Sequence, residues 1–163
     1  MDSKKIVLVT ALVFLAIISI ASVSAWDLFG TSSESTTTVG GYEFNIPDGF
    51  EKNESFECIN ETTTEGPATF YVNAEGFQKG DDEVIYIHVA DYSVPGYEAN
   101  LTTNQLKQSG LGDSKTINGI EGLIAKNEFD DLKVTAFFYA KGGDLITVMS
   151  TDESLLEQII PEE

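Results

Sequence analysis

Apolar and polar residues alternate most regularly between residues 115 and 151, where they predict a run of short antiparallel strands. Asn118-Gly119 favours a two-residue hairpin turn, because both positions tolerate a positive φ. Further turns are expected at Asp130-Asp131 and at residues 141–144. The predicted strands cover residues 115–117, 120–128, 132–140 and 145–150. On the third of them, Phe138 is expected on one face of the sheet and Phe137 on the other.

Three more strands are predicted upstream, at residues 42–46, 68–74 and 83–90. The first should end at Pro47-Asp48-Gly49, because proline donates no ladder hydrogen bond and Asp-Gly favours a turn. The third is almost continuously apolar, which is typical of a central strand covered on both faces. Gly80-Asp81-Asp82 separates the second strand from the third, so we expect these two to pair as a hairpin.

Helical patterns appear twice. Residues 97–109 lack β-type alternation and are followed by Gly110, which suits a helix C-terminus. Residues 152–160 carry an apolar stripe that ends before Pro161, and Ser150 with Glu153 fits a capping box. The stripe consists of Leu155, Leu156, Ile159 and Ile160.

Together these elements predict an α+β fold. We expect a mostly antiparallel sheet of about five to seven strands, with two helices packed on it, as a single domain over residues 41–163. That length suits one hydrophobic core. The polar residues 51–66 show no strand or helix period, so they are expected to form an irregular loop. Any activity is expected in this loop or in the connection at residues 91–100.

The first 25 residues resemble a secretory signal. Lys4 and Lys5 precede an apolar run at residues 6–20, and small residues lead to a cleavage site after Ala25. The alternative is an uncleaved anchor at residues 6–25, just long enough to span a membrane as a helix. In both cases the rest of the chain is exported to the cell surface or the extracellular space. It is attached to the membrane only if the N-terminal segment is not cleaved. Residues 26–40 are rich in Ser and Thr and predict a flexible tether.

The charge narrows the range of partners. The formal net charge is −18, from nine Lys and 27 acidic residues, and the chain contains no Arg. A nucleic-acid-binding protein needs a basic face, so this function class is excluded, as is electrostatic docking to anionic lipid. The acidity either serves solubility or favours cationic partners.

Candidate chemistry is sparse. His88 is the only histidine, so neither a metal cluster nor a nucleophile–base pair is expected around it. Cys58 is the only cysteine, which excludes an intramolecular disulfide and leaves a buried thiol or a reactive one. Asp81-Asp82-Glu83 and Asp130-Asp131 are carboxylate clusters without the spacing of a calcium loop. No catalytic residue, cofactor or metal is therefore predicted.

Three asparagines occupy N-glycosylation sequons, at Asn53-Glu54-Ser55, Asn60-Glu61-Thr62 and Asn100-Leu101-Thr102. A chain rich in Ser and Thr also produces such triplets by chance. Both interpretations stay open from the sequence alone.

The order of the elements resembles a known family. An opening strand with a proline turn (YEFNIPDGF), a middle helix, the Asn118-Gly119-x-x-Gly122 segment, an aromatic strand (TAFFYA), a Gly-Gly turn and a closing helix are similar to the Mog1/PsbP-like α/β/α sandwich. The signal, the aromatic start WDLFG and the Ser/Thr spacer also resemble small exported proteins of unknown function from methanogenic archaea. The resemblance implies a fold and a non-enzymatic accessory or binding role, with no site residue carried over.

Three functions follow as expectations. The first is a non-catalytic surface or extracellular module that binds a protein, a cell-envelope polymer or a small ligand. The second is a structural, glycosylated envelope component. The third is a hydrolase or redox enzyme of unfamiliar type.

Overall fold

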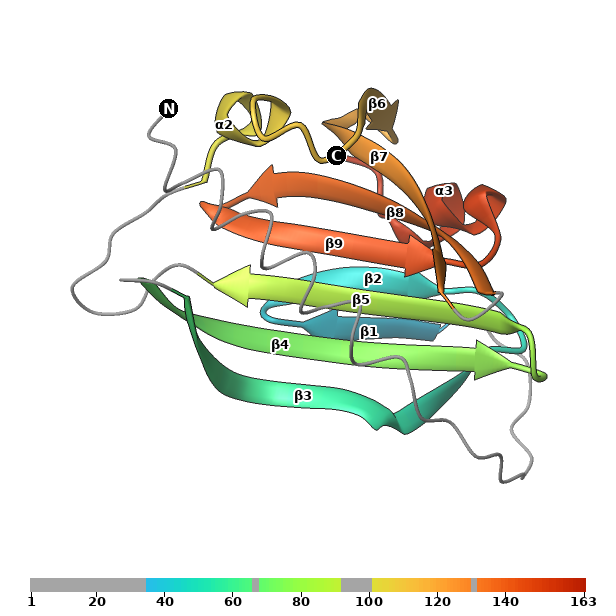
Figure 1. The fold of residues 1–163 in the computed structure, drawn as a ribbon. Helices are drawn as coiled ribbons and strands as arrows, with labels where there is room; N and C mark the ends of the chain where they lie inside the picture. Colours follow the sequence, from blue (N-terminus) through green and yellow to red (C-terminus); the bar gives the residue numbers. More distant parts are fainter. Residues whose placement is uncertain (1–34, 66–67, 92–100, 130–131) are drawn as a thin grey trace.

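The computed structural model describes residues 35–65, 68–91, 101–129 and 132–163 and contains two antiparallel sheets (Figure 1). The larger has seven strands in the order β3-β4-β5-β9-β8-β7-β6, and the smaller is the β1–β2 hairpin. The predicted signal or transmembrane helix and the cleavage site after Ala25 lie outside these residues. The strands are β1 (Ser35–Val39), β2 (Tyr42–Ile46), β3 (Glu51–Glu65), β4 (Ala68–Lys79), β5 (Glu83–Asp91), β6 (Asp113–Ile117), β7 (Ile120–Phe129), β8 (Leu132–Lys141) and β9 (Asp144–Ser150).

The predicted α+β class is wrong, because strands dominate the fold. Only two short α-helices occur in the described ranges, α2 (Thr103–Lys107) and α3 (Leu156–Ile159), the latter after a 3-10 turn, η1 (Glu153–Leu155). Helix α2 begins at Thr103, because Thr102 and Gln105 form a capping box at its N-terminus. Gly110, with φ +76°, lies just beyond its end. Residues 97–100 of the predicted helix lie outside the described part.

The expected loop at residues 51–66 is also wrong, because residues 51–65 form β3, the longest strand. Among the described strands it lies at the edge of the sheet and pairs only with β4, so one row of its backbone groups has no partner among them. Its register shifts twice, between Asn53 and Cys58 and between Cys58 and Glu61. Such bulges break the period of two by which a strand is recognised in a sequence.

The Ser/Thr-rich residues 35–39, assigned to the tether, form β1 instead. They pair with β2 in full register, from Ser35 opposite Ile46 to Val39 opposite Tyr42. Val39 is buried, and threonine is a favoured strand residue. The folded part therefore begins before the predicted boundary at residue 41.

The hairpins predicted from turn residues are confirmed. Asn118 and Gly119 have φ values of +49° and +84° and join β6 to β7. The β4–β5 pair and the successive pairing of β7, β8 and β9 are also as expected. Thus the sheet consists of two meanders, β3–β5 and β6–β9. They meet where β5 pairs with β9, from Ile85 opposite Ser150 to Ala90 opposite Leu145.

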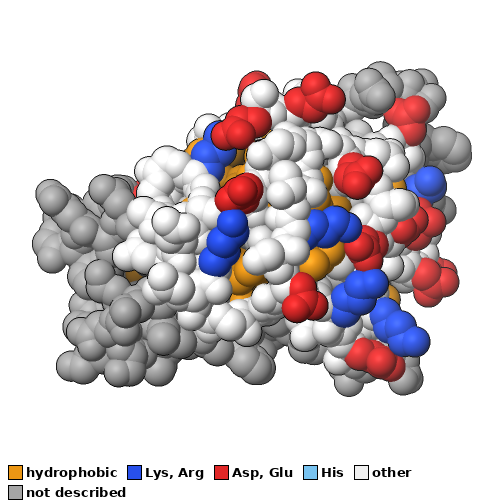
Figure 2. All heavy atoms as spheres, turned by 90° about the horizontal axis from the view of Figure 1, so that it is seen from above, with side chains coloured by type: hydrophobic (Ala, Val, Ile, Leu, Met, Phe, Trp, Pro, Cys, Tyr) orange, Lys and Arg blue, Asp and Glu red, His pale blue; other side chains and the backbone are white. Residues whose placement is uncertain are grey.

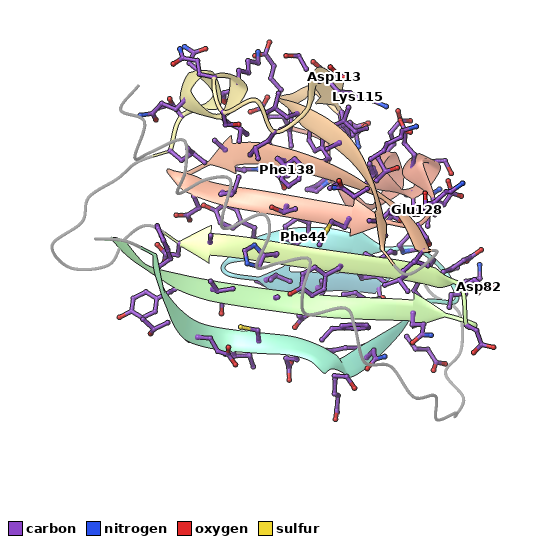
Figure 3. The ribbon with its side chains drawn as sticks, in the orientation of Figure 1. Phe44, Asp82, Asp113, Lys115, Glu128 and Phe138 are labelled. Atoms are coloured by element: carbon purple, nitrogen blue, oxygen red, sulfur yellow. The ribbon has the colours of Figure 1, made fainter. Side chains whose placement is uncertain are left out.

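Both faces of the sheet are apolar, as the continuous burial of residues 85–90 on β5 requires. One face of the sheet, called the hairpin face here, is covered by the β1–β2 hairpin and α3 (Figure 1). The opposite face, called the α2 face, is covered by α2. Phe44 and Phe137 belong to the hairpin face and Phe138 to the α2 face, which confirms the predicted alternation on β8 (Figure 3). The largest fully buried side chains are Tyr139, Phe44, Phe70, Phe137, Phe138, Ile46, Ile85, Ile87, Leu106, Ile117 and Leu123.

The predicted capping box at the C-terminal helix is wrong. Ser150 is buried inside β9, and its hydroxyl accepts a hydrogen bond from the Asp152 backbone N–H at 3.2 Å. Asp152 is the N-cap residue, and its carboxylate accepts from the Ser154 backbone N–H at 2.9 Å. Glu153 points instead toward lysines of neighbouring strands, because two ammonium groups lie within ion-pair distance of it.

Candidate functional site

A cleft of about 460 Å³ lies where the β7–β8 hairpin meets the start of η1. Strands β7 and β8 form one wall, and the passage from β9 into η1 forms the other. Its volume falls within the range of about 300–1,000 Å³ that is usual for small-molecule sites. The lining residues are Lys126, Asn127, Glu128, Lys133, Val134, Thr135, Thr151, Asp152 and Glu153.

Backbone pairing makes the second wall rigid. The Thr151 backbone N–H donates to the Val84 carbonyl at 3.1 Å, and the Thr151 hydroxyl accepts from the Val84 N–H at 3.1 Å. These two bonds extend the β5–β9 ladder past the last residue of β9. Thr135, opposite Ser150 on β8, is buried in the same region. This wall of the cleft is therefore built on sheet backbone.

Glu153 organises the basic groups beside the cleft. Its carboxylate accepts from Lys126 Nζ at 2.7 Å and from Lys115 Nζ at 2.9 Å. The hydrogen bond from Lys126 and that from Lys115 hold the pKa of Glu153 below its usual value. Figure 2, which views the molecule from above, shows lysines and acidic side chains interspersed on this side. The two lysines are therefore already neutralised in the free protein.

Glu128 and Lys133 are two further charged residues at the cleft. They are cross-strand partners in the β7–β8 register, and Glu128 lies at the end of the hairpin (Figure 3). No ion pair with any residue of the described ranges engages either side chain. One ammonium and one carboxylate at the cleft therefore remain available to a ligand.

His88 lies on the α2 face, away from the cleft, and is buried. Its ring stacks on Tyr86 with 6.4 Å between the ring centroids, and Thr147 is its partner on β9. Burial lowers the pKa of His88 to about 4, so the imidazole is neutral at pH 7. Within the described residues, Nδ1 has no hydrogen-bond partner. No carboxylate or hydroxyl from this part of the chain thus orients the ring through Nδ1 as it would a catalytic base.

Cys58 carries a protonated thiol. Its Sγ is half-buried and donates to the Val72 carbonyl at 3.5 Å, and burial raises its pKa to about 11. A thiol in this state is a poor nucleophile, which favours the buried alternative over the reactive one.

The carboxylate clusters do not converge. Asp81 and Asp82 are exposed in the β4–β5 turn, and Glu83 pairs with Lys79 at 3.7 Å. Across the residues that the structure describes, no three His, Cys, Asp or Glu side chains are placed to hold a metal ion. The Asp130-Asp131 cluster is outside the described ranges.

The sequence missed the cleft because its residues come from three separate elements and form no motif. The expected site at residues 51–66 is an edge strand, and residues 92–100 of the other expected site lie outside the described part. The one available signal was the spacing of the lysines, since Lys115, Lys126 and Lys133 occur within a short stretch of a lysine-poor chain.

Comparison with known proteins gives no relatives. No family model, no curated protein and no solved structure matches the chain. The Mog1/PsbP-like resemblance therefore stays a prediction. In the ranges available for description, no helix is long and apolar enough to cross a membrane.

Proposed function

We propose that the protein is an exported, acidic binding module of the cell surface or extracellular space, and that its ligand occupies the cleft between β7–β8 and η1. The observation that carries the proposal is the Glu128–Lys133 pair. These two charges lie side by side at a cleft of ligand size, and neither has an ion-pair partner within the described residues. Charged side chains that are not engaged by the protein can bind groups of opposite charge on a ligand.

The cleft chemistry favours a polar ligand with both an acidic and a basic or hydroxyl group. The Lys133 ammonium suits a carboxylate or phosphate, and the Glu128 carboxylate suits an amine or a hydroxyl. Thr135 and Asn127 add neutral polar groups to the lining. A fragment of a cell-envelope polymer, such as an acidic amino sugar, a uronic acid or a short peptide, has this combination. Long polyanions are disfavoured by the net charge of −18.

The test is a titration of the isotope-labelled protein with soluble envelope fragments of these three kinds, followed by amide NMR shifts. We expect the shifts to cluster at residues 126–128, 133–135 and 151–153. Lys133→Met should weaken binding about tenfold, because it removes one charge-assisted hydrogen bond. Lys141→Met, at the β8–β9 turn and outside the cleft, is the matched control and should leave the affinity unchanged. Shifts elsewhere, or equal effects of the two substitutions, would refute this site.

A further inference from the structure

β3 is a long edge strand that has no neighbour on its outer side among the described strands. An exposed row of backbone donors and acceptors is a template for pairing with another chain, and native proteins usually block it. The two sequons within the described ranges, at Asn53 and Asn60, both lie on this strand. The edge also carries Ile59, which is 64% exposed and is an unusually exposed large apolar side chain here.

Asn60 is set up as an acceptor. It has φ +48° and lies within the second register shift, so the strand bends there. Its backbone N–H donates to Asn73 Oδ1 at 3.0 Å, which holds the bulge in place. The Asn60 side chain is exposed and forms no hydrogen bond with other described residues. Its amide nitrogen is therefore free to react, and it is held away from the ladder.

Asn53 differs in the state of its side chain. Its side chain is half-buried, and Nδ2 donates to Gln78 Oε1 at 3.1 Å. Its Oδ1 accepts from the Ser55 backbone N–H at 3.0 Å. The nitrogen that would carry a sugar is thus already engaged on the neighbouring strand. The bond from Nδ2 to Gln78 would have to open before transfer to the folded chain.

We propose that Asn60, and not Asn53, is N-glycosylated, and that the glycan covers the β3 edge beside Ile59. In the transfer step, Asn60 Nδ2 forms a bond to the anomeric carbon of a lipid-linked oligosaccharide. The bond between that carbon and the lipid phosphate oxygen breaks, and an amide proton passes to a base of the transferase. The proposal rests on the export of the chain, since such transfer takes place outside the cytoplasm.

The first test is site-resolved mass spectrometry of the protein isolated from its native cell fractions. We expect a glycan on Asn60 and a bare Asn53. Thr62→Ala removes the Asn60 sequon and should abolish the glycan, whereas Ser55→Ala removes the Asn53 sequon and should leave the mass of the glycoprotein otherwise unchanged. An exported chain with a bare Asn60, or with both sites equally occupied, overturns the glycan proposal alone. A bare chain found only inside the cell overturns export as well.

The second test addresses the shielding role. Deglycosylated protein or Asn60→Gln should associate at a lower concentration than the glycoprotein in sedimentation velocity. Ile59→Lys in the Asn60→Gln background should restore the monomer, because a charge on the edge opposes strand pairing. If the unglycosylated protein stays monomeric at every concentration at which the glycoprotein does, the shielding role is wrong.

Discussion

The side-chain amide of Asn118 donates two hydrogen bonds to the C-terminal helix, to the Ile160 carbonyl at 2.6 Å and to the Glu157 carbonyl at 2.8 Å. The last carbonyls of a helix have no partner within the helix and need one from elsewhere. The residue that forms the β6–β7 turn therefore also holds α3 against the sheet. In return, the Glu163 backbone N–H donates to the Asn118 carbonyl at 3.3 Å.

This double role separates two substitutions of Asn118. Asn118→Gly keeps the left-handed backbone but removes both side-chain bonds, so we expect a loss of about 1–2 kcal/mol in unfolding free energy. Asn118→Ala should lose about 1 kcal/mol more, because alanine is strained at φ +49°. Urea denaturation measures both. A glycine variant as stable as the parent would show that the two bonds contribute nothing.

Gly76 makes room for the aromatic ring of Phe56. A Cβ at position 76 would lie 2.5 Å from Phe56 Cβ, so Gly76→Ala forces β3 away from β4. We expect a loss of about 1–3 kcal/mol, as is usual for overpacking. The control is the same change in a Phe56→Gly background, where both the Cβ and the ring that would clash are absent and most of the loss should disappear. Equal losses in both backgrounds would place the strain elsewhere.

Much of the second half of the fold was predictable, because its turns are chemically explicit. Asn118-Gly119 and Gly142-Gly143 supply residues that tolerate the positive φ of their turns, and the strands between them alternate as β8 does. The first half was harder. Among residues 51–62 of β3 only Phe56 is buried, and the bulges of this strand shift the side-chain period, so its sequence looks like a polar loop.

The helix boundaries were predicted wrongly and the cleft was not predicted, and the physical reasons differ. Helical periodicity in a short segment says little about length, because caps and packing decide where a helix starts and stops. Asp152 took the capping position that Ser150 was expected to fill, since Ser150 stays in the β9 ladder. The cleft depends on the register of β7 with β8 and on the path after β9, and no local pattern encodes a contact between Lys126 and Glu153.

His88 should make stability depend on pH in one window. Its pKa is about 4 in the folded state and about 6.5 in the unfolded state, so between these values the unfolded chain binds the extra proton. Unfolding free energy should therefore fall as the pH drops from 6.5 toward 4, with about 2 kcal/mol lost by pH 5. Urea titrations at pH 7, 6 and 5 measure this loss.

His88→Leu removes the titration and should flatten this slope. Carboxylates titrate in the same window in both proteins, so the difference between the two slopes isolates the histidine. If the leucine variant loses stability as steeply as the parent, the imidazole is not what limits folding in acid.

Asp152 should matter more to the C-terminal turn than Glu153. Asp152→Ala removes the cap on the Ser154 N–H and should destabilise the protein by about 1 kcal/mol. Glu153→Gln weakens two ion pairs at the surface, which should have a smaller effect that vanishes in high salt. Thermal melts at low and high salt compare the two variants. The reverse ranking would mean that the two ion pairs of Glu153 stabilise the protein more than the Asp152 cap does.

The seam between β5 and β9 has a consequence for how the chain can be divided. Among the described strands, it is the single ladder that joins the two meanders, and it runs over six residue pairs. A chain cut between Asp91 and Thr103 leaves every hairpin of each piece whole. The two polypeptides would then recognise each other through one pair of complementary strand edges and through the packing of α3 on the β1–β2 hairpin. Such a protein is suited to use as a split reporter, in which reassembly of two separately produced halves signals that their fusion partners have met.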